Sequence, residues 1–193
     1  MSVHAPAAWL TIVEAGLVAR ALRQMPPPTG APLDADEALA GRAAIAAKFL
    51  AVGTPRTLGL VGCGDLAPLV IAAQRAYAAP RELRVFEAVP VEAARVADEV
   101  QGRVVSLAEA CACDIVVARG PVSVRRAWVR GGTLITALDA DVALDPALLA
   151  AAQVYGDAAP AGVTLTATLA AVAAGLVDGR VLDEITLCLP PSP

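Results

Sequence analysis

The stretch Leu58-Gly59-Leu60-Val61-Gly62-Cys63-Gly64-Asp65-Leu66-Ala67 decides the fold. A short apolar run leads into the pattern G-x-G-x-x-A, and helical spacing follows from Asp65 to Ala78. In such a turn Gly62 allows the tight exit from a strand, Gly64 lets the backbone approach a pyrophosphate, and Ala67 lets the helix pack closely on the strand. Free N–H groups at the helix N-terminus favour phosphate binding. The stretch therefore predicts a strand, turn and helix that bind a dinucleotide.

A carboxylate follows this turn at the spacing that the motif requires. A second apolar run, residues 83–86, ends at Glu87, about 20 residues after the glycines, where a Rossmann fold places its ribose-binding acid. A carboxylate accepts hydrogen bonds from ribose hydroxyls and repels a 2′-phosphate, so Glu87 favours NAD over NADP. The opposing interpretation is a Rossmann-like sheet that binds no nucleotide. The charge of Asp65 beside the glycines supports it, unless Asp65 is a helix cap that points outward.

Short apolar runs alternate with helical segments along the rest of the chain. Strands of this length between helices indicate βαβ units. The predicted fold class is α/β, a Rossmann-type doubly wound parallel sheet with a small N-terminal helical appendage and a returning C-terminal strand. The further predicted strands are 103–105, 115–117, 133–137, 154–155 and 185–189. The further predicted helices are 6–24, 36–51 with Asp34 or Asp36 as cap, 91–100, a short one from Leu107, 146–152 and 160–176. Residues 25–33 are predicted to be a proline-rich linker.

Composition and charge exclude several classes of function. The chain has 193 residues, is 57% hydrophobic and carries a net charge of −4. The uncharged stretch 158–177 is about as long as a bilayer span, but it contains Pro160 and Gly162 and has no flanking basic cluster, so we expect a buried helix and no membrane partner. The basic residues form no run, so binding of nucleic acid has no electrostatic basis.

The cysteines and the single histidine do not have the spacing of a metal site. Cys111 and Cys113 form a C-x-C pair without a second pair, and the histidine is His4, so we expect no metal and reduced, buried thiols. The N-terminus lacks the basic start and uninterrupted apolar stretch of a signal peptide, so a cytoplasmic location is expected.

Several segments, in order and spacing, resemble the ornithine cyclodeaminase/mu-crystallin family. They are 43–51 with 57–67, 106–117, 129–137, 145–149 and 183–187, within a resemblance that covers about 38–189. The resemblance implies a Rossmann domain inserted into a substrate domain, to which the last strand returns, and a homodimer formed through the substrate domain. It also implies oxidation or reduction of a C–N bond in a small amino or imino acid with NAD(H) or NADP(H).

The resemblance also implies a division of the chain. Residues 1–51 would be a helical remnant of the substrate and dimerisation domain, residues 52–182 the dinucleotide-binding domain, and residues 183–193 a strand and tail. The chain has about fifty residues before the first Rossmann strand where the family has roughly a hundred, so most of the substrate domain has no counterpart here.

Further site residues follow from the resemblance. Arg42 lies one helical turn beyond the position of the family's substrate-binding arginine and is a displaced substitute for it. Asp139 and Asp141 are candidates for the family's loop aspartate, which handles the substrate nitrogen; both could equally be solvated loop carboxylates. Near the nicotinamide the family usually has Thr and Ser after the fourth strand, where this chain has Ala118 and Arg119 instead; Ala137 ends the fifth strand. Arg119 would reach a phosphate or a substrate carboxylate, or be solvated. The complete expected cofactor set is Gly62, Cys63, Gly64, Asp65, Leu66, Ala67, Glu87, Ala118, Arg119 and Ala137.

Two functions remain open from the sequence. The first is an NAD-dependent oxidoreductase or cyclodeaminase acting on a small amino or imino acid, with the cofactor supplying the redox chemistry. The second is a dinucleotide-binding or assembly protein that lost catalysis, which the displaced arginine and the short N-terminal region favour.

Overall fold

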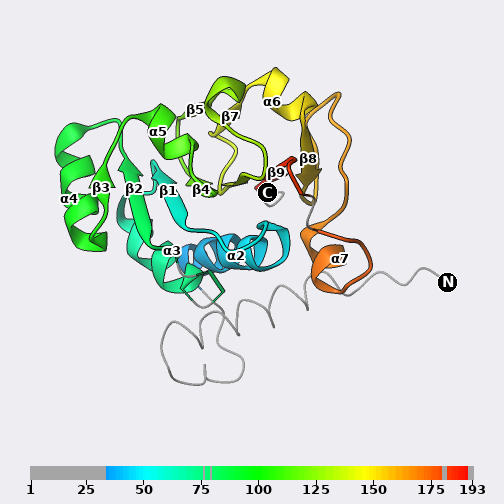
Figure 1. The fold of residues 1–193 in the computed structure, drawn as a ribbon, viewed down its shortest axis with the longest axis horizontal. Helices are drawn as coiled ribbons and strands as arrows, with labels where there is room; N and C mark the ends of the chain where they lie inside the picture. The colour runs from blue at the N-terminus through cyan, green and yellow to red at the C-terminus, as the bar shows by residue number, and fades with distance from the viewer. Residues whose placement is uncertain (1–33, 76, 79, 180–181, 191–193) are drawn as a thin grey trace.

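The centre of the molecule is a parallel sheet covered by helices on both faces (Figure 1). The computed structural model describes residues 34–75, 77–78, 80–179 and 182–190. Within these residues the sheet has seven strands in the order β3-β2-β1-β4-β6-β9-β8. The strands are β1 (Thr57–Val61), β2 (Glu82–Phe86), β3 (Arg103–Val104), β4 (Ile115–Ala118), β6 (Leu134–Ala137), β8 (Ala152–Tyr155) and β9 (Ile185–Cys188); the helices are α2 (Ala35–Leu50), α3 (Ala67–Gln74), α4 (Pro90–Val100), α5 (Leu107–Cys111), α6 (Pro146–Ala150) and α7 (Leu169–Ala173).

The inner strands β1, β4, β6 and β9 are largely apolar because both faces of the sheet are buried there, whereas β3 at the edge is exposed. Successive side chains of a strand point to opposite faces. In β4, Ile115 and Val117 join the core cluster that contains α2 and α3, whereas Val116 and Ala118 join the cluster on the side of α5 and α6. Figure 1 shows these two pairs of helices on opposite sides of the sheet. This arrangement confirms the predicted α/β Rossmann-type class.

The strand order reverses direction between β1 and β4. From β1 the chain continues to β2 and β3 on one side, and then crosses back to begin β4 on the other side of β1. In doubly wound sheets the carboxyl ends of the two strands at such a point border the ligand crevice. The glycine turn that follows β1 therefore lies at the edge where a ligand is expected.

The last strand and the first described helix belong to the main body of the molecule. We expected residues 183–193 and residues up to 51 to form a separate appendage, but β9 lies inside the sheet, paired with β6 and β8, and its four residues are buried. Helix α2, which Asp34 caps through the N–H of Glu37, packs against α3 and under the sheet. The short apolar β9 is stable there because neighbouring strands satisfy its backbone on both sides.

The predicted long helix over 160–176 is wrong. Only α7, with its Thr168 cap, is an α-helix there. The preceding residues contain Pro160 and Gly162, and Thr166 instead bonds the backbone of Val154 in β8. Two elements escaped prediction, the two-residue strands β5 (Ser123–Val124) and β7 (Ala143–Leu144), which pair with each other.

Two sequence predictions on the N-terminal side lie outside the described residues, namely the helix over 6–24 and the linker over 25–33. Across the part of the chain that the structure does describe, no helix combines the length and the apolar character that crossing a bilayer requires.

Candidate functional site

The glycine turn after β1 has the backbone conformation that its sequence predicts. Gly62 has a φ of +66°, and its N–H donates to the carbonyl of Phe86 at 2.9 Å. A Cβ atom added to Gly62 would lie 2.2 Å from the carbonyl oxygen of Arg119, so the turn passes directly against the chain leaving β4. A larger residue at Gly62 would therefore clash with backbone.

Gly64 faces open space at the start of the first crossover helix. Its φ is +50°, and a Cβ atom added to it would meet nothing within 4 Å. The chain then makes a single 3-10 turn, Gly64–Leu66, before α3 begins at Ala67 with Pro68 in its first turn. The space over Gly64 and the adjoining helix start fit a pyrophosphate, because glycine leaves the backbone accessible and a helix N-terminus attracts anions.

The side chains between these glycines and the helix are mostly buried. Leu66 and Ala67 anchor the turn in the core. The thiol of Cys63 lies 3.4 Å from the carbonyl oxygen of Val117, and burial, the largest influence, raises the pKa of Cys63 to about 12. Cys63, Leu66 and Ala67 can therefore offer a ligand only their backbone.

Glu87 lies beside the glycine turn, at the end of β2. It follows the last residue of β2, and its Oε1 accepts a hydrogen bond from the N–H of Gly64 at 2.8 Å. Burial raises the pKa of Glu87 above its ordinary value, although the bond from Gly64 opposes the rise. The carboxylate thus lies at the position predicted for a ribose-binding acid, already linked to the glycine turn.

The side chain of Asp65 is exposed and reaches α4. Its side chain is 92% exposed and forms an ion pair of 2.6 Å with Arg95 of α4. The charge of Asp65 is therefore exposed to solvent and paired with Arg95, which weakens the objection that it would repel a pyrophosphate.

A second polar group lies at the same edge of the sheet, past β4 and β6. The carboxylate of Asp139 accepts the N–H of Gly120 at 3.0 Å and the N–H of Asp141 at 3.2 Å. Arg119 contributes a longer ion pair, with its Nε 3.9 Å from Asp139, and it also lies 3.6 Å from Asp36. Asp141 is exposed and supports this arrangement through its backbone.

A cavity of about 420 Å³ opens beside Asp139. Its walls come from the chain that follows β6, β8 and β9, so it lies at the carboxyl edge of the sheet like the glycine turn. Among the described residues that line it, Asp139 alone has an ionisable side chain; these residues are Ala137, Asp139, Ala140, Val142, Leu144, Leu149, Ala158, Ala159, Pro160, Leu189 and Pro190. Ala118, the neighbour of Ala137 in the sheet register, is buried beneath this edge.

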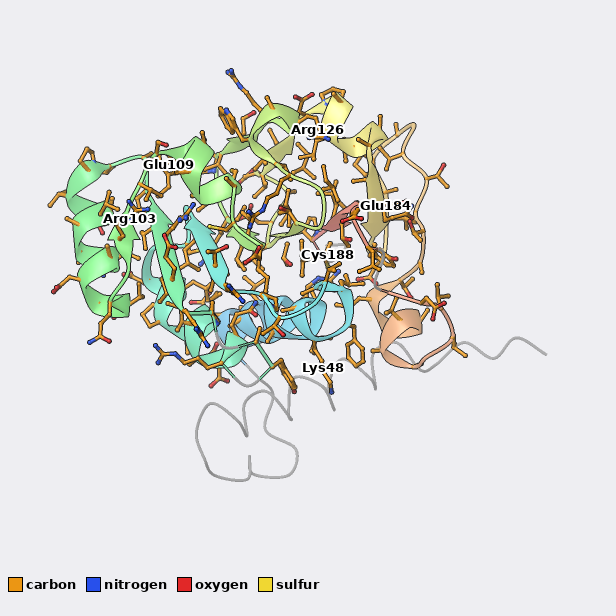
Figure 2. The ribbon with its side chains drawn as sticks, in the orientation of Figure 1. Lys48, Arg103, Glu109, Arg126, Glu184 and Cys188 are labelled. Carbon is orange, nitrogen blue, oxygen red and sulfur yellow. The ribbon has the colours of Figure 1, made fainter. Side chains whose placement is uncertain are left out.

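Arg42 lies behind the wall of this cavity and binds the protein's own chain. Its Nη2 donates to the carbonyl of Leu189 at 2.9 Å, and its Nη1 is 3.5 Å from Asp157. The side chain is 15% exposed, and its Nε has no hydrogen-bond partner among the described residues. Nearby Cys188, labelled in Figure 2, lies at the end of β9 in the core cluster that includes α2. Among the described residues no group of three His, Cys, Asp or Glu is placed to hold a metal.

Residues 36–187 match the model of the ornithine cyclodeaminase/mu-crystallin family. The chain belongs to this family. An alanine dehydrogenase of Archaeoglobus fulgidus is 31% identical in an alignment of 170 positions that covers 72% of this chain and 52% of the relative. This member of the family therefore spans about half the length of that curated relative.

Solved structures of the family share the fold of this member. An archaeal alanine dehydrogenase dimer with bound NAD superimposes with a TM-score of 0.74 and 25% identity, over 86% of this chain and 63% of that one. The Δ1-pyrroline-2-carboxylate reductase of Thermococcus litoralis, solved with NADH and L-proline, gives 0.71 and 21%, over 86% and 64%. The second likeness shows the fold alone.

Sequence reasoning identified this family member's glycine turn and Glu87 but missed most of the cavity lining, of which the predicted site residues include only Ala137 and Asp139. Leu189 and Pro190 escaped because β9 was assigned to a separate appendage. Had β9 been placed in the sheet, the rule that parallel strands end at one edge would have located both residues there. The segment 158–160 escaped because it was assigned to a helix.

Proposed function

We propose that this family member binds NAD(H) and takes part in hydride transfer at the C–N bond of a small amino or imino acid. The observation that carries the proposal is the placement of the Gly62–Ala67 turn, Glu87 and the cavity beside Asp139 along one edge of the sheet. The nicotinamide, when bound, supplies the hydride chemistry. Membership of the family supports the same class of reaction.

Each part of this edge has a separate binding role in the proposal. Backbone N–H groups of the turn and of the start of α3 hold the pyrophosphate. Glu87 accepts hydrogen bonds from the adenosine ribose and favours NAD over NADP, since its carboxylate repels a 2′-phosphate. The small residues Ala118 and Ala137 end β4 and β6, where they leave room for a flat ring.

Asp139 is the residue that we assign to the substrate nitrogen. It lines the cavity, whereas Asp141 is exposed and outside the lining. A carboxylate in that place can hold an ammonium group or accept its proton. Arg119, 3.9 Å from Asp139, is the cation best placed to bind a substrate carboxylate. Arg42 stays a weaker candidate, because Leu189 and Asp157 occupy its guanidinium.

The walls of the cavity favour a substrate with an apolar side chain. Apart from Asp139 the lining side chains are Ala, Val, Leu and Pro. The side-chain ammonium of ornithine would be a further charge against these apolar walls, and burying it costs several kcal/mol unless it is paired. Alanine, proline and their imines therefore fit better than ornithine.

Titration with NADH, followed by nicotinamide fluorescence, tests binding, and a screen of alanine, proline, ornithine and cyclic ketimines tests turnover. We expect binding, turnover of an apolar substrate, and a loss of about 100-fold or more in turnover for Asp139→Asn. Asp141→Asn is the matched control and should keep nearly full activity. Absence of NADH binding at millimolar concentration would refute the proposal, and equal effects of the two variants would refute the role of Asp139.

A dinucleotide-binding protein without turnover is the second candidate. The observation that favours it is the engagement of Arg42 with the protein's own Leu189 and Asp157. NADH binding without turnover of any substrate in the screen would select it. A homodimer, as in the archaeal alanine dehydrogenase, remains a prediction that light scattering checks.

A further inference from the structure

The guanidinium of Arg95 is held by three carboxylates. Its Nε lies 2.8 Å from Glu92, its Nη1 3.2 Å from Glu99 and its Nη2 2.6 Å from Asp65. Glu92 and Glu99 are on the same helix as Arg95, one turn before it and one turn after it. Asp65 instead comes from the glycine turn, so it alone of the three links α4 to the candidate cofactor site.

Arg95 lies within electrostatic reach of Glu87. Burial raises the pKa of Glu87, Glu92 adds to the rise, and the positive charge of Arg95 opposes it. The cluster formed by Asp65, Glu87, Glu92, Arg95 and Glu99 therefore carries four carboxylates around one guanidinium. A phosphate beside Glu87 would meet net negative charge, and the nearby cation would already be bonded at each of its nitrogens.

We propose that Asp65 is a specificity-determining residue that excludes NADP by holding Arg95 away from the 2′-phosphate position. This inference rests on the proposed binding of NAD(H) and adds a second determinant to Glu87. An arginine free to form a bidentate contact is the usual partner of a 2′-phosphate. Here the Nη2 of Arg95 is bonded to Asp65, a residue of the glycine turn, so removal of Glu87 alone leaves Arg95 paired.

The proposal predicts different effects on NADP binding for two substitutions that remove the same charge. Asp65→Asn and Glu99→Gln each remove one negative charge from the same guanidinium. Asp65→Asn frees the Nη2 of Arg95 from a residue of the glycine turn, whereas Glu99→Gln frees the Nη1 from a residue of α4 itself. The exposed side chain of Asp65 allows its substitution without disturbing the core.

The test measures binding of NADH, NADPH, 5′-ADP and 2′,5′-ADP by fluorescence and calorimetry, with thermal unfolding as the check on folding. The variants are Glu87→Ser alone, the same change with Asp65→Asn, and the same change with Glu99→Gln. We expect Asp65→Asn to tighten 2′,5′-ADP and NADPH about tenfold relative to Glu87→Ser alone, the gain of one charge-assisted contact. Glu99→Gln should change them less than about threefold. Adding Arg95→Gln to the Asp65→Asn variant should abolish the gain.

The inference is overturned if Glu87→Ser alone gives the full gain, if Glu99→Gln matches Asp65→Asn, or if the gain survives Arg95→Gln. Failure of the wild-type protein to bind NADH and 5′-ADP would overturn the proposed function together with this inference. Wild-type binding of NADH with unchanged selectivity in the variants would overturn the inference alone.

Discussion

Gly62 and Gly64 share a positive φ but differ in what surrounds them, and this difference predicts different outcomes for the same substitution. Gly62→Ala would place a Cβ atom against the carbonyl oxygen of Arg119, so we expect a loss of more than about 2 kcal/mol in the free energy of unfolding. Gly64→Ala has only the strain of its left-handed backbone, about 1–2 kcal/mol. Its added methyl would occupy the space proposed for the pyrophosphate. The loss in the free energy of NADH binding should therefore exceed the loss in the free energy of unfolding.

Urea unfolding and NADH titration of the two variants check this prediction. Equal destabilisation by both substitutions would contradict the packing argument. Unchanged NADH affinity in Gly64→Ala would contradict the proposed position of the pyrophosphate.

The starts of β1 and β4 are joined by Asp114. Its carboxylate accepts hydrogen bonds from the N–H of Arg56 at 2.8 Å, from the N–H of Thr57 at 2.9 Å and from the hydroxyl of Thr57, and it forms an ion pair with Arg130. Burial by itself would raise the pKa of Asp114, but these bonds hold it below the ordinary value of 3.8. Two neighbouring strands of the sheet are thus aligned by one charged side chain.

Asp114→Asn should cost about 1–3 kcal/mol of unfolding free energy at neutral pH, since it removes the charge and one acceptor oxygen. The folded-state pKa of Asp114 is depressed, so its stabilisation is full above about pH 4 and is lost as the pH falls further. Urea unfolding at neutral and acid pH should therefore show the gap between wild type and variant closing in acid. Asp98→Asn, an exposed aspartate of α4, is the control. A gap that stays constant with pH would refute the assignment.

The accuracy of sequence prediction differed between elements for physical reasons. β1, β4 and β6 were predicted because strands buried on both faces are nearly continuous apolar runs, and α4 because its apolar spacing is helical. The helix over 160–176 failed because apolar composition alone does not distinguish a helix from an extended chain that bonds to β8. The sequence left Asp139 and Asp141 as equal candidates for another reason: two carboxylates two residues apart differ only in where the loop directs them.

The position of β9 between β6 and β8, one strand from the edge of the sheet, makes the fold depend on the last described residues. β9 pairs with β6 on one side and β8 on the other, and it joins residues far apart in the chain. A chain that stops after Glu184 would leave two strand edges and the apolar faces beside them exposed, so we expect it to lose cooperative unfolding and to aggregate. A chain that stops after Pro190 retains β9 and should unfold cooperatively. Circular dichroism during urea titration distinguishes the two, and cooperative unfolding of the shorter chain would contradict the assigned role of β9.

The amino-acid sequence by itself determined the strand, turn and helix of the first βαβ unit, with Glu87 at the end of the second strand. These features are local, because the conformations of glycine and the alternation of short apolar runs with helices are properties of adjacent residues. The tertiary structure alone decided that β9 completes the sheet, that Asp139 rather than Asp141 lines the cavity, that Arg42 binds the chain itself, and that Asp65 is paired with Arg95. Each of these depends on contacts between distant segments, whose geometry exists only once the sheet has formed.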